Sequence, residues 1–442
     1  MTALLPHLER GAEVVRVEET PPEPPATDLD LYEIADDPAH AYAYRAAAAR
    51  PGVLLLRDWS IHGLLVEATL RAGDASAYLR EMRRDYGETG AFVARQVGRG
   101  RGGRLLPSLF PSNLRLLEES LGVVASTARI RSRAARRLPG RPLLELPLDL
   151  LVPALPVPAR DDARRHLGLP GDGPVIAVVA DDPEAARLPV VLRAVGRLRR
   201  PSPGEGRPGR GVRVVALEAT RLEGAGLEVP LIVTGPLDTA RLLEWLAAAD
   251  VVVALRFPAP GGLPPPVVRA LEARRPVLVT AGTPPAEELP AGAVVPVAPD
   301  GGEEDELIAL LAHLLERPAL CERIGAYARE HLDAARDPAG AARRLLAFLG
   351  AVGAGRDEAR RRIAADRAEE GTLLGYALEE VRRGARDLGL AGAHLGLEPL
   401  LAGLLGGPSR ERTGEPGGRQ RSPPPAGGGK ASGADEEHEG PA

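Results

Sequence analysis

Short apolar runs alternate with amphipathic stretches along most of this chain. Residues 52–57, 122–126, 174–179 and 251–255 carry almost no polar side chains. Runs of this length without polar alternation are typical of strands buried on both faces of a parallel sheet. Between the runs, apolar residues recur at three- and four-residue spacing, which predicts helices. Strands that alternate with helices indicate βαβ units and therefore an α/β fold.

The first part of the chain carries one set of these elements. We expect helices through Leu8, at 38–49 with Asp37 as N-cap, and at 64–72, 75–86 and 129–137. We expect strands at 12–17, 31–34, 52–57, 122–126 and 142–146.

A Pro-rich stretch at 152–160 joins this set to a second one. There we expect helices at 161–167, 188–200, around 242–246, at 264–274, two within 305–332, and at 357–390. Strands are expected at 174–179, 212–217, 231–233, 251–255 and 276–280, and a surface loop at 201–211.

The last residues differ in composition from the rest of the chain. From about Gly406 the sequence is rich in Gly, Pro and charged residues, cannot bury apolar area, and is expected to be disordered. We therefore expect a first Rossmann-like domain at 1–151, a second at 161–350, C-terminal helices at 351–405, and a tail at 406–442.

Composition excludes several classes of protein. At 442 residues the chain is long enough for two domains, and a net charge of −5 gives no reason to expect nucleic-acid binding. The single cysteine, Cys321, allows no disulfide framework and is expected to be a packed residue in a cytoplasmic protein. No run of about 18 apolar residues occurs, so we expect at most peripheral membrane contact.

The segment 241–282 is the most informative, because it predicts a helix, a strand, a Pro/Gly loop, a second helix and a second strand. Ligands bind at the carboxyl ends of strands in such sheets. The segment resembles the donor-binding core of the retaining glycosyltransferases of family 4, which have the GT-B fold. The matching residues are Ala248, Ala249, Asp250, Arg256, Pro258, Gly261, Arg275, Pro276 and Val277.

The resemblance also covers residues 163–180 and 306–330. Sequence segments of the first half, including 30–62 and 106–127, are similar to a bacterial subset of the same family. It implies two Rossmann-like domains facing a cleft, with C-terminal helices that return to the first domain. It also implies a hexosyltransferase that takes a nucleotide-sugar and needs no metal or other cofactor. The acceptor stays open between a glycan, a lipid-linked and a protein group.

Relative to this family, the chain starts inside a helix, so the first strand and its small-residue loop are expected to be absent. A misassigned start codon is the simpler of two explanations, and a true truncation is the other.

The resemblance assigns Arg187 and Arg256 to donor binding. The family lysine that neutralises the donor diphosphate aligns with Ala186, and the neighbouring Arg187 can bind phosphate bidentately. The alternative is an exposed arginine at the start of a helix.

Gly261 and Gly262 are also assigned to the donor, through backbone N–H groups that can approach a phosphate. The family glutamate that contacts donor hydroxyls aligns with Gly262, and a second one aligns with Arg269, so two carboxylates are lost. Pro264, Pro265 and Pro266 remove N–H donors from the following helix, and a plain turn is an equal alternative.

His62 ends a polar cluster, 57–62, that follows a predicted strand. We expect it either to orient an acceptor hydroxyl as the catalytic residue or to be a structural histidine. Asp149 is expected to be a solvent-exposed linker residue. No metal-binding motif and no Walker loop occurs. The lost carboxylates leave a second function open, a catalytically inactive GT-B protein that serves as a binding or partner subunit.

Overall fold

The computed structural model describes residues 3–17, 25–199, 211–220, 229–259 and 261–370, together with residues 380, 381 and 384. The chain divides into two compact units, Met1–Leu395 and Gly396–Ala442, and all described residues belong to the first. Nearly all of the predicted loop 201–211, most of the predicted helix beyond residue 370, and the predicted tail lie outside the described residues.

The first half contains a parallel sheet of four strands in sequential order. These are β1 (Leu31–Ile34), β2 (Val53–Leu56), β3 (Gly122–Ala125) and β4 (Leu143–Glu145). Every residue of β2 and β3 is buried, as the continuous apolar runs predict.

Helices cover both faces of this sheet, because successive strand residues point to opposite sides. One core holds Leu54, Leu56 and Val123 with helices α2, α3, α4, α6 and α7. These helices span Ala41–Ala49, His62–Ala68, Ala75–Val97, Leu114–Glu118 and Ala128–Arg137.

The other core holds Val53, Leu55 and Val124 with α1 (Leu5–Leu8), α15 (Pro338–Ala354) and α16 (Arg356–Glu370). The predicted return of the C-terminal helices to the first sheet is therefore confirmed. It begins at α15, upstream of the boundary predicted at residue 351.

Two segments of this half differ from the prediction. Residues 12–17 form no strand, because only Val14 packs on the core while Val15 is 52% exposed, which leaves too little apolar area to hold a ladder. Helix α4 runs past the predicted end at residue 86, but Gly87 breaks its helical geometry with a φ of 60°, a conformation that glycine adopts without strain. Two short helices, η1 (Pro38–His40) and α5 (Leu106–Leu109), complete this half.

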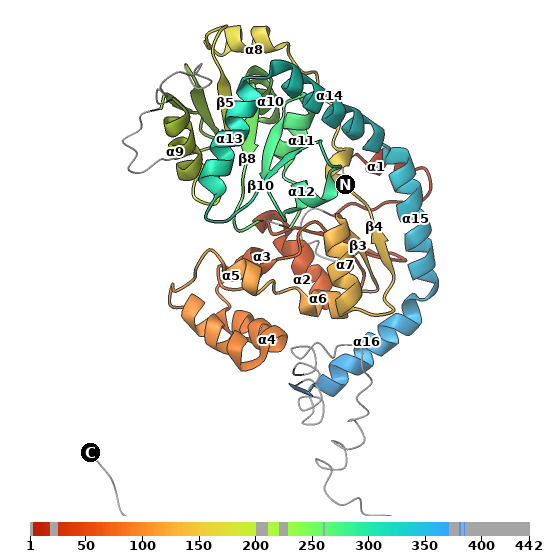
Figure 1. Cartoon of the computed structure of the whole chain (residues 1–442). Helices are drawn as coiled ribbons and strands as arrows, with labels where there is room; N and C mark the ends of the chain where they lie inside the picture. Colours follow the sequence, from red (N-terminus) through yellow and green to blue (C-terminus); the bar gives the residue numbers. More distant parts are fainter. Residues whose placement is uncertain are drawn as a thin grey trace, which may run out of the picture. The chain divides into compact units, whose positions relative to one another are not determined.

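The second half contains a parallel sheet of six strands in the order β10-β9-β8-β5-β6-β7. Figure 1 labels three of them, β5, β8 and β10. The strands are β5 (Val175–Val179), β6 (Arg213–Leu217), β7 (Leu231–Val233), β8 (Val251–Ala254), β9 (Val277–Thr280) and β10 (Val295–Val297). Five of them lie where the sequence predicts, and β10 was not predicted. The strand order reverses at β5, so the topological switch point lies between β5 and β8.

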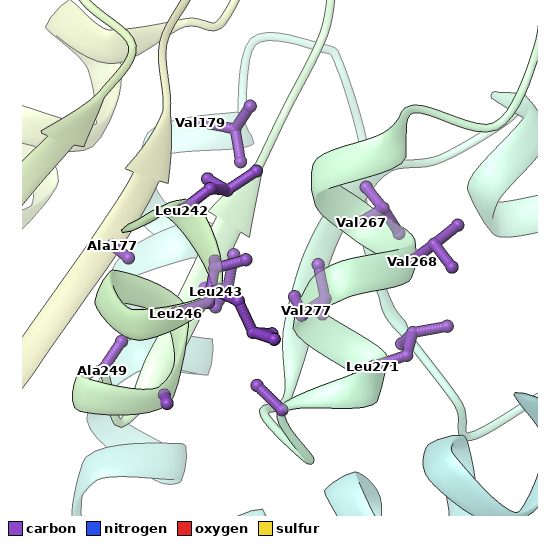
Figure 2. Packing of buried hydrophobic residues seen from close by; sticks show 14 of the residues in the cluster. Ala177, Val179, Leu242, Leu243, Leu246, Ala249, Val267, Val268, Leu271 and Val277 are labelled. Atoms are coloured by element: carbon purple, nitrogen blue, oxygen red, sulfur yellow. The ribbon is translucent and has the colours of Figure 1, made fainter. Parts of the chain in front are cut away.

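Helices also cover both faces of the second sheet, so the predicted fold class of two Rossmann-like α/β domains is confirmed. Ala177, Val179 and Val277 pack against α10 (Thr239–Ala248) and α11 (Pro265–Glu272), as Figure 2 shows. The opposite face packs against α9 (Leu188–Arg199) and α13 (Glu303–Leu315). The remaining elements are η2 (Leu148–Leu151), α8 (Arg160–His166), α12 (Pro284–Glu288) and α14 (Pro318–Ala335). Within the described ranges, no helix is both long and apolar enough to cross a membrane.

Asp250, in the Ala-Ala-Asp motif, holds the start of this sheet together. Its carboxylate accepts hydrogen bonds from Arg160 Nη2, Arg164 Nη2 and the Val175 N–H, each at 2.7 Å. Arg164 is only 1% exposed and also donates to the Ala248 carbonyl. This motif residue is therefore explained by structure alone, since it joins α8 to the beginning of β5.

Candidate functional site

The predicted donor loops lie beside each other at the switch point of the second sheet. One loop follows β5 and the other follows β8, and the Phe257 N–H in the second donates to the Ala185 carbonyl in the first at 2.8 Å. Because ligands of open parallel sheets bind outside this point, the position agrees with the sequence analysis.

Arg187 lies in the loop that follows β5, immediately before α9, and its charge is balanced by a carboxylate. Its Nε lies 2.9 Å from Glu303 Oε2, and its Nη2 also contacts that oxygen. The hydrogen bond that Arg187 donates to the Glu303 carboxylate raises the pKa of Arg187. Glu303 is the first residue of α13 and is 3% exposed. A phosphate that binds Arg187 through Nε and Nη2 would have to displace this partner.

Arg256 is paired in the same way. Its guanidinium contacts Asp181, the second residue after β5, and its backbone N–H donates to Thr280 Oγ1 at 2.9 Å. Both predicted cations therefore lie at the switch point, and each has a carboxylate of the same half as its partner.

Gly261 and Gly262 pack against the backbone of the first half. A Cβ at Gly261 would lie 2.3 Å from the Trp59 nitrogen, and one at Gly262 would lie 2.9 Å from the Arg57 carbonyl oxygen. Real Cβ atoms do not approach backbone this closely, so only glycine fits at 261 without a shift. A glutamate at position 262 would likewise require the loop or the first half to shift, because its Cβ would lie too close to the Arg57 carbonyl oxygen.

Two carboxylates of the first half bind the N–H groups of this glycine loop. Asp58 accepts from the Gly261 N–H, and Asp149 Oδ2 accepts from the Leu263 N–H at 3.1 Å. We call Asp58, Asp149 and these two N–H groups the carboxylate clasp. Asp149 Oδ1 also lies 2.6 Å from Arg57 Nη2. Of the two backbone donors that the sequence analysis assigned to a phosphate, the Gly261 N–H is thus occupied by Asp58, and the neighbouring Leu263 N–H is occupied by Asp149.

The clasp corrects one expectation and adds one residue. Asp149 lies in η2 and is only 6% exposed, so its assignment as a solvent-exposed linker residue is wrong. The sequence analysis did not assign Asp58 to the site, although its position in the polar cluster after β2 was a signal. Burial raises the pKa of Asp58.

The start of α11 offers no free anion site. Pro264, Pro265 and Pro266 have no N–H, and the first N–H group, that of Val267, donates to the Pro264 carbonyl at 3.0 Å. At the other end of α11, Glu272 is buried and accepts from the Leu155 N–H at 3.0 Å and from Arg336 Nη2 at 2.9 Å. Glu272 therefore holds the linker and α14, and does not replace a lost donor-binding carboxylate.

His62 begins α3 and is buried in a polar cluster of the first half. Its Nδ1 lies 2.8 Å from the Phe110 carbonyl oxygen, and its Nε2 lies 3.0 Å from the Tyr78 hydroxyl. Burial lowers the pKa of His62. Because both ring nitrogens are occupied inside the first half, the geometry favours the structural alternative, and a catalytic role stays a prediction.

Asp85 is buried in the same half, and its ionisation should make the stability of the protein depend on pH. Its Oδ2 accepts from the Leu114 N–H at 3.2 Å, while its Oδ1 has no partner. Burial raises the pKa of Asp85 to about 7. An unfolded aspartate ionises near pH 4, so the folded chain holds one more proton than the unfolded chain between about pH 4 and 7.

We expect this proton to make the protein less stable as the pH rises. The free energy of unfolding should fall by about 1 kcal/mol per pH unit from pH 5 to 7, because the unfolded state releases the proton more easily. Asp85→Asn keeps an acceptor for the Leu114 N–H and should remove this part of the slope. Urea unfolding at several pH values measures it, and equal slopes in both proteins would contradict the assignment.

Cys321 packs beside an apolar core of the second half. The Cys321 thiol donates to the Leu314 carbonyl at 3.3 Å, and burial raises its pKa to about 11, as expected for a packed residue. Among the described residues, no three His, Cys, Asp or Glu side chains are grouped to hold a metal ion.

Comparison with known proteins finds likeness in structure but not in sequence. No family model and no curated protein matches the chain. Among solved structures, it is similar to Anabaena HepE in complex with UDP-glucose, at 15% identity and a TM-score of 0.47 over 73% of this chain and 79% of that one.

Two further structures are similar over a comparable length. WaaG, a glycosyltransferase involved in lipopolysaccharide biosynthesis, is 14% identical over 70% of this chain and 80% of its own, with a TM-score of 0.43. OtsA is 13% identical over 71% and 78%, also with a TM-score of 0.43. At these values the fold assignment rests on the two sheets of this chain and on their helices.

Proposed function

We propose that this chain is a glycosyltransferase that moves a sugar from a nucleotide-sugar to an acceptor hydroxyl with retention of configuration. The observation that carries the proposal is the position of Arg187 and Arg256, which lie together at the switch point between β5 and β8. A donor diphosphate there would replace Glu303 and Asp181 as their partner, and a diphosphate offers more charge than either carboxylate.

The transfer reaction requires the protein mainly to stabilise the leaving diphosphate and to position the acceptor. The bond between the anomeric carbon and the diphosphate oxygen breaks, the acceptor oxygen bonds to the same face of the sugar, and its proton passes to the leaving phosphate. Two arginines that neutralise the diphosphate would supply the electrostatic part. Nothing in this chemistry needs a metal ion, and the acceptor is left as a glycan, a lipid-linked or a protein group.

Arg187→Ala should weaken the binding of a nucleoside diphosphate about ten- to a hundredfold. The variant loses a charge-assisted contact of roughly 1.5–3 kcal/mol. Calorimetric titration of the full chain with UDP and UDP-glucose, the ligand of the HepE structure, measures the effect. Arg193→Ala is the matched control, because Arg193 lies on α9 and pairs with Glu304 on the surface. Equal affinities in wild type and Arg187→Ala would contradict the assignment.

A non-catalytic binding or partner subunit is the second candidate, and the carboxylate clasp favours it. Both cations and both loop N–H groups already have carboxylate partners, and Gly262 has replaced a donor-binding glutamate. A thermal-shift screen with nucleoside diphosphates and nucleotide-sugars, followed by turnover assays, decides between the two functions. Turnover by the wild type establishes the transferase and the anomer of its product, whereas no binding by any of these ligands supports the partner subunit.

A further inference from the structure

One carboxylate beside the candidate donor site differs from its neighbours. Glu218 is half-buried and follows β6 directly. The end of β6 lies against the loop after β5, since the Ala180 N–H donates to the Leu217 carbonyl at 3.0 Å. Burial and the charge of the nearby Asp181 raise the pKa of Glu218. Glu218 therefore belongs to the same edge of the sheet as the two arginines assigned to the diphosphate.

The neighbouring carboxylates already have partners, whereas Glu218 has none. The three carboxylates in the loop after β5 and the one at the start of α13 that faces Arg187 each pair with an arginine. They are Asp181, Asp182, Glu184 and Glu303. Among the residues that the structure describes, no side chain or N–H group binds the Glu218 carboxylate. A half-buried carboxylate in this position has lost hydration without gaining a hydrogen bond, so a ligand that brings donors would satisfy it.

The backbone of Glu218 adopts a conformation that is unfavourable for a glutamate. Its φ is 62°, in the left-handed region that glycine enters without strain. The end of β7 fixes this turn, because the Glu218 N–H donates to Thr234 Oγ1 at 3.0 Å and the Gly235 N–H donates to the Ala219 carbonyl at 3.2 Å. Arg187, at the end of the neighbouring loop, has a φ of 56°. Residues strained in this way cluster at binding sites, where the surrounding structure holds a required side chain in place.

The position of Glu218 relative to the arginines fits a nucleotide. In doubly wound sheets that bind dinucleotides, the diphosphate lies at the turn after the first strand, and an acidic residue farther along the chain binds the ribose. β5 is the first strand of the second sheet along the chain, and β6 is both the next strand and its neighbour. Adjacent strands lie about 4.8 Å apart. A diphosphate on the arginines after β5 could therefore extend its ribose toward the end of β6.

We propose that the Glu218 carboxylate accepts hydrogen bonds from the ribose hydroxyls of the nucleotide donor and makes the site selective for ribonucleotides. This role rests on the proposed function, because it requires a nucleotide at the switch point. A carboxylate has two acceptor oxygens and a ribose has two neighbouring hydroxyl donors, so the contact can be bidentate. Glu218 would then supply a carboxylate to a donor site that has lost those aligned with Gly262 and Arg269.

The test is calorimetric titration of the full chain with UDP and with 2′-deoxy-UDP. Wild type should bind UDP about tenfold more tightly, because the deoxy nucleotide lacks one hydrogen bond to a charged group. Glu218→Gly should weaken UDP binding at least about tenfold and bind the two nucleotides equally. Glu184→Ala is the matched control. Glu184 lies at the same edge but pairs with Arg104, so this variant should keep the preference for UDP.

The stability of Glu218→Gly separates a binding role from a structural one. Glycine adopts a φ of 62° without strain, so the variant should unfold at a urea concentration no lower than that of wild type. A lower midpoint would show that the glutamate is kept for the fold and would contradict the binding role. Glu218→Ala is the second variant, and it should lose the preference for UDP in the same way.

The outcomes separate this role from the proposed transferase. Equal binding of UDP and 2′-deoxy-UDP by wild type, or the same preference in wild type and Glu218→Gly, would overturn the role of Glu218 and leave the transferase standing. A preference for GDP over UDP that disappears in Glu218→Gly would also overturn it, because the carboxylate would then contact the base. No binding of UDP or GDP up to about 10 mM would contradict the transferase, and the role of Glu218 with it.

Discussion

Replacing Asp250 by alanine should lower the free energy of unfolding by about 3–5 kcal/mol. The carboxylate accepts from two arginines and from the Val175 N–H. Without it, the guanidinium of Arg164 stays buried beside the Ala248 carbonyl but loses its counter-charge. An uncompensated buried charge costs far more than a lost surface pair, which contributes at most about 1 kcal/mol.

Asp161→Ala is the matched control for this prediction. Asp161 pairs with the same Arg160, at 3.3 Å, but its side chain is exposed to solvent. Chemical denaturation followed by circular dichroism measures both variants. If Asp250→Ala unfolds at the same denaturant concentration as Asp161→Ala, Asp250 does not hold α8 and β5 together. The presence of aspartate at this position of the family motif would then need another explanation.

Gly262→Glu should also destabilise the protein by about 3 kcal/mol or more, and it should not restore donor binding. The new Cβ would lie 2.9 Å from the Arg57 carbonyl oxygen and 3.4 Å from Asp149 Oδ2. Overpacking against backbone costs about 1–3 kcal/mol, and a third carboxylate beside Asp58 and Asp149 adds like-charge repulsion. The glutamate would therefore open the carboxylate clasp before it met a donor.

Gly103→Glu provides the comparison, because no atom lies within 4 Å of a Cβ at Gly103. Thermal unfolding and UDP-glucose titration of both variants give the two readouts. A Gly262→Glu protein that keeps wild-type stability and gains nucleotide-sugar affinity would contradict this prediction. It would show that the loop with Gly261 and Gly262 can move away from the backbone of residues 57–59 at no cost in stability. The carboxylate clasp would then not close the site.

The sequence predicted the sheets well because burial on both faces leaves a local pattern. Strands β2, β3, β5 and β8 are runs of apolar residues with no room for polar alternation, and each lies within one or two residues of its predicted range. The segment 12–17 includes the charged residues Glu13 and Arg16, and only one of its side chains, that of Val14, reaches a core. The short strand β10 was not predicted, because a proline interrupts its apolar run.

The site was harder to predict, because its decisive contacts join distant parts of the chain. Arg187 and Arg256 were assigned from the resemblance to the glycosyltransferase family. Their carboxylate partners could not be assigned in this way, and neither could the contact between Asp149 and the Leu263 N–H, which are 114 residues apart. The close approach of Gly261 and Gly262 to the backbone of residues 57–59 could not be predicted from the sequence either.

The path of α15 has a consequence for the way the protein comes apart. The chain crosses from the first sheet to the second once, near η2, and crosses back once, between α14 and α15. A single protease cut in the stretch 152–160 should therefore release neither half, since the second crossing still tethers them. The nicked protein should migrate as two fragments under denaturing conditions and as one particle in gel filtration, because α15 and α16 of the second fragment pack on the sheet of the first.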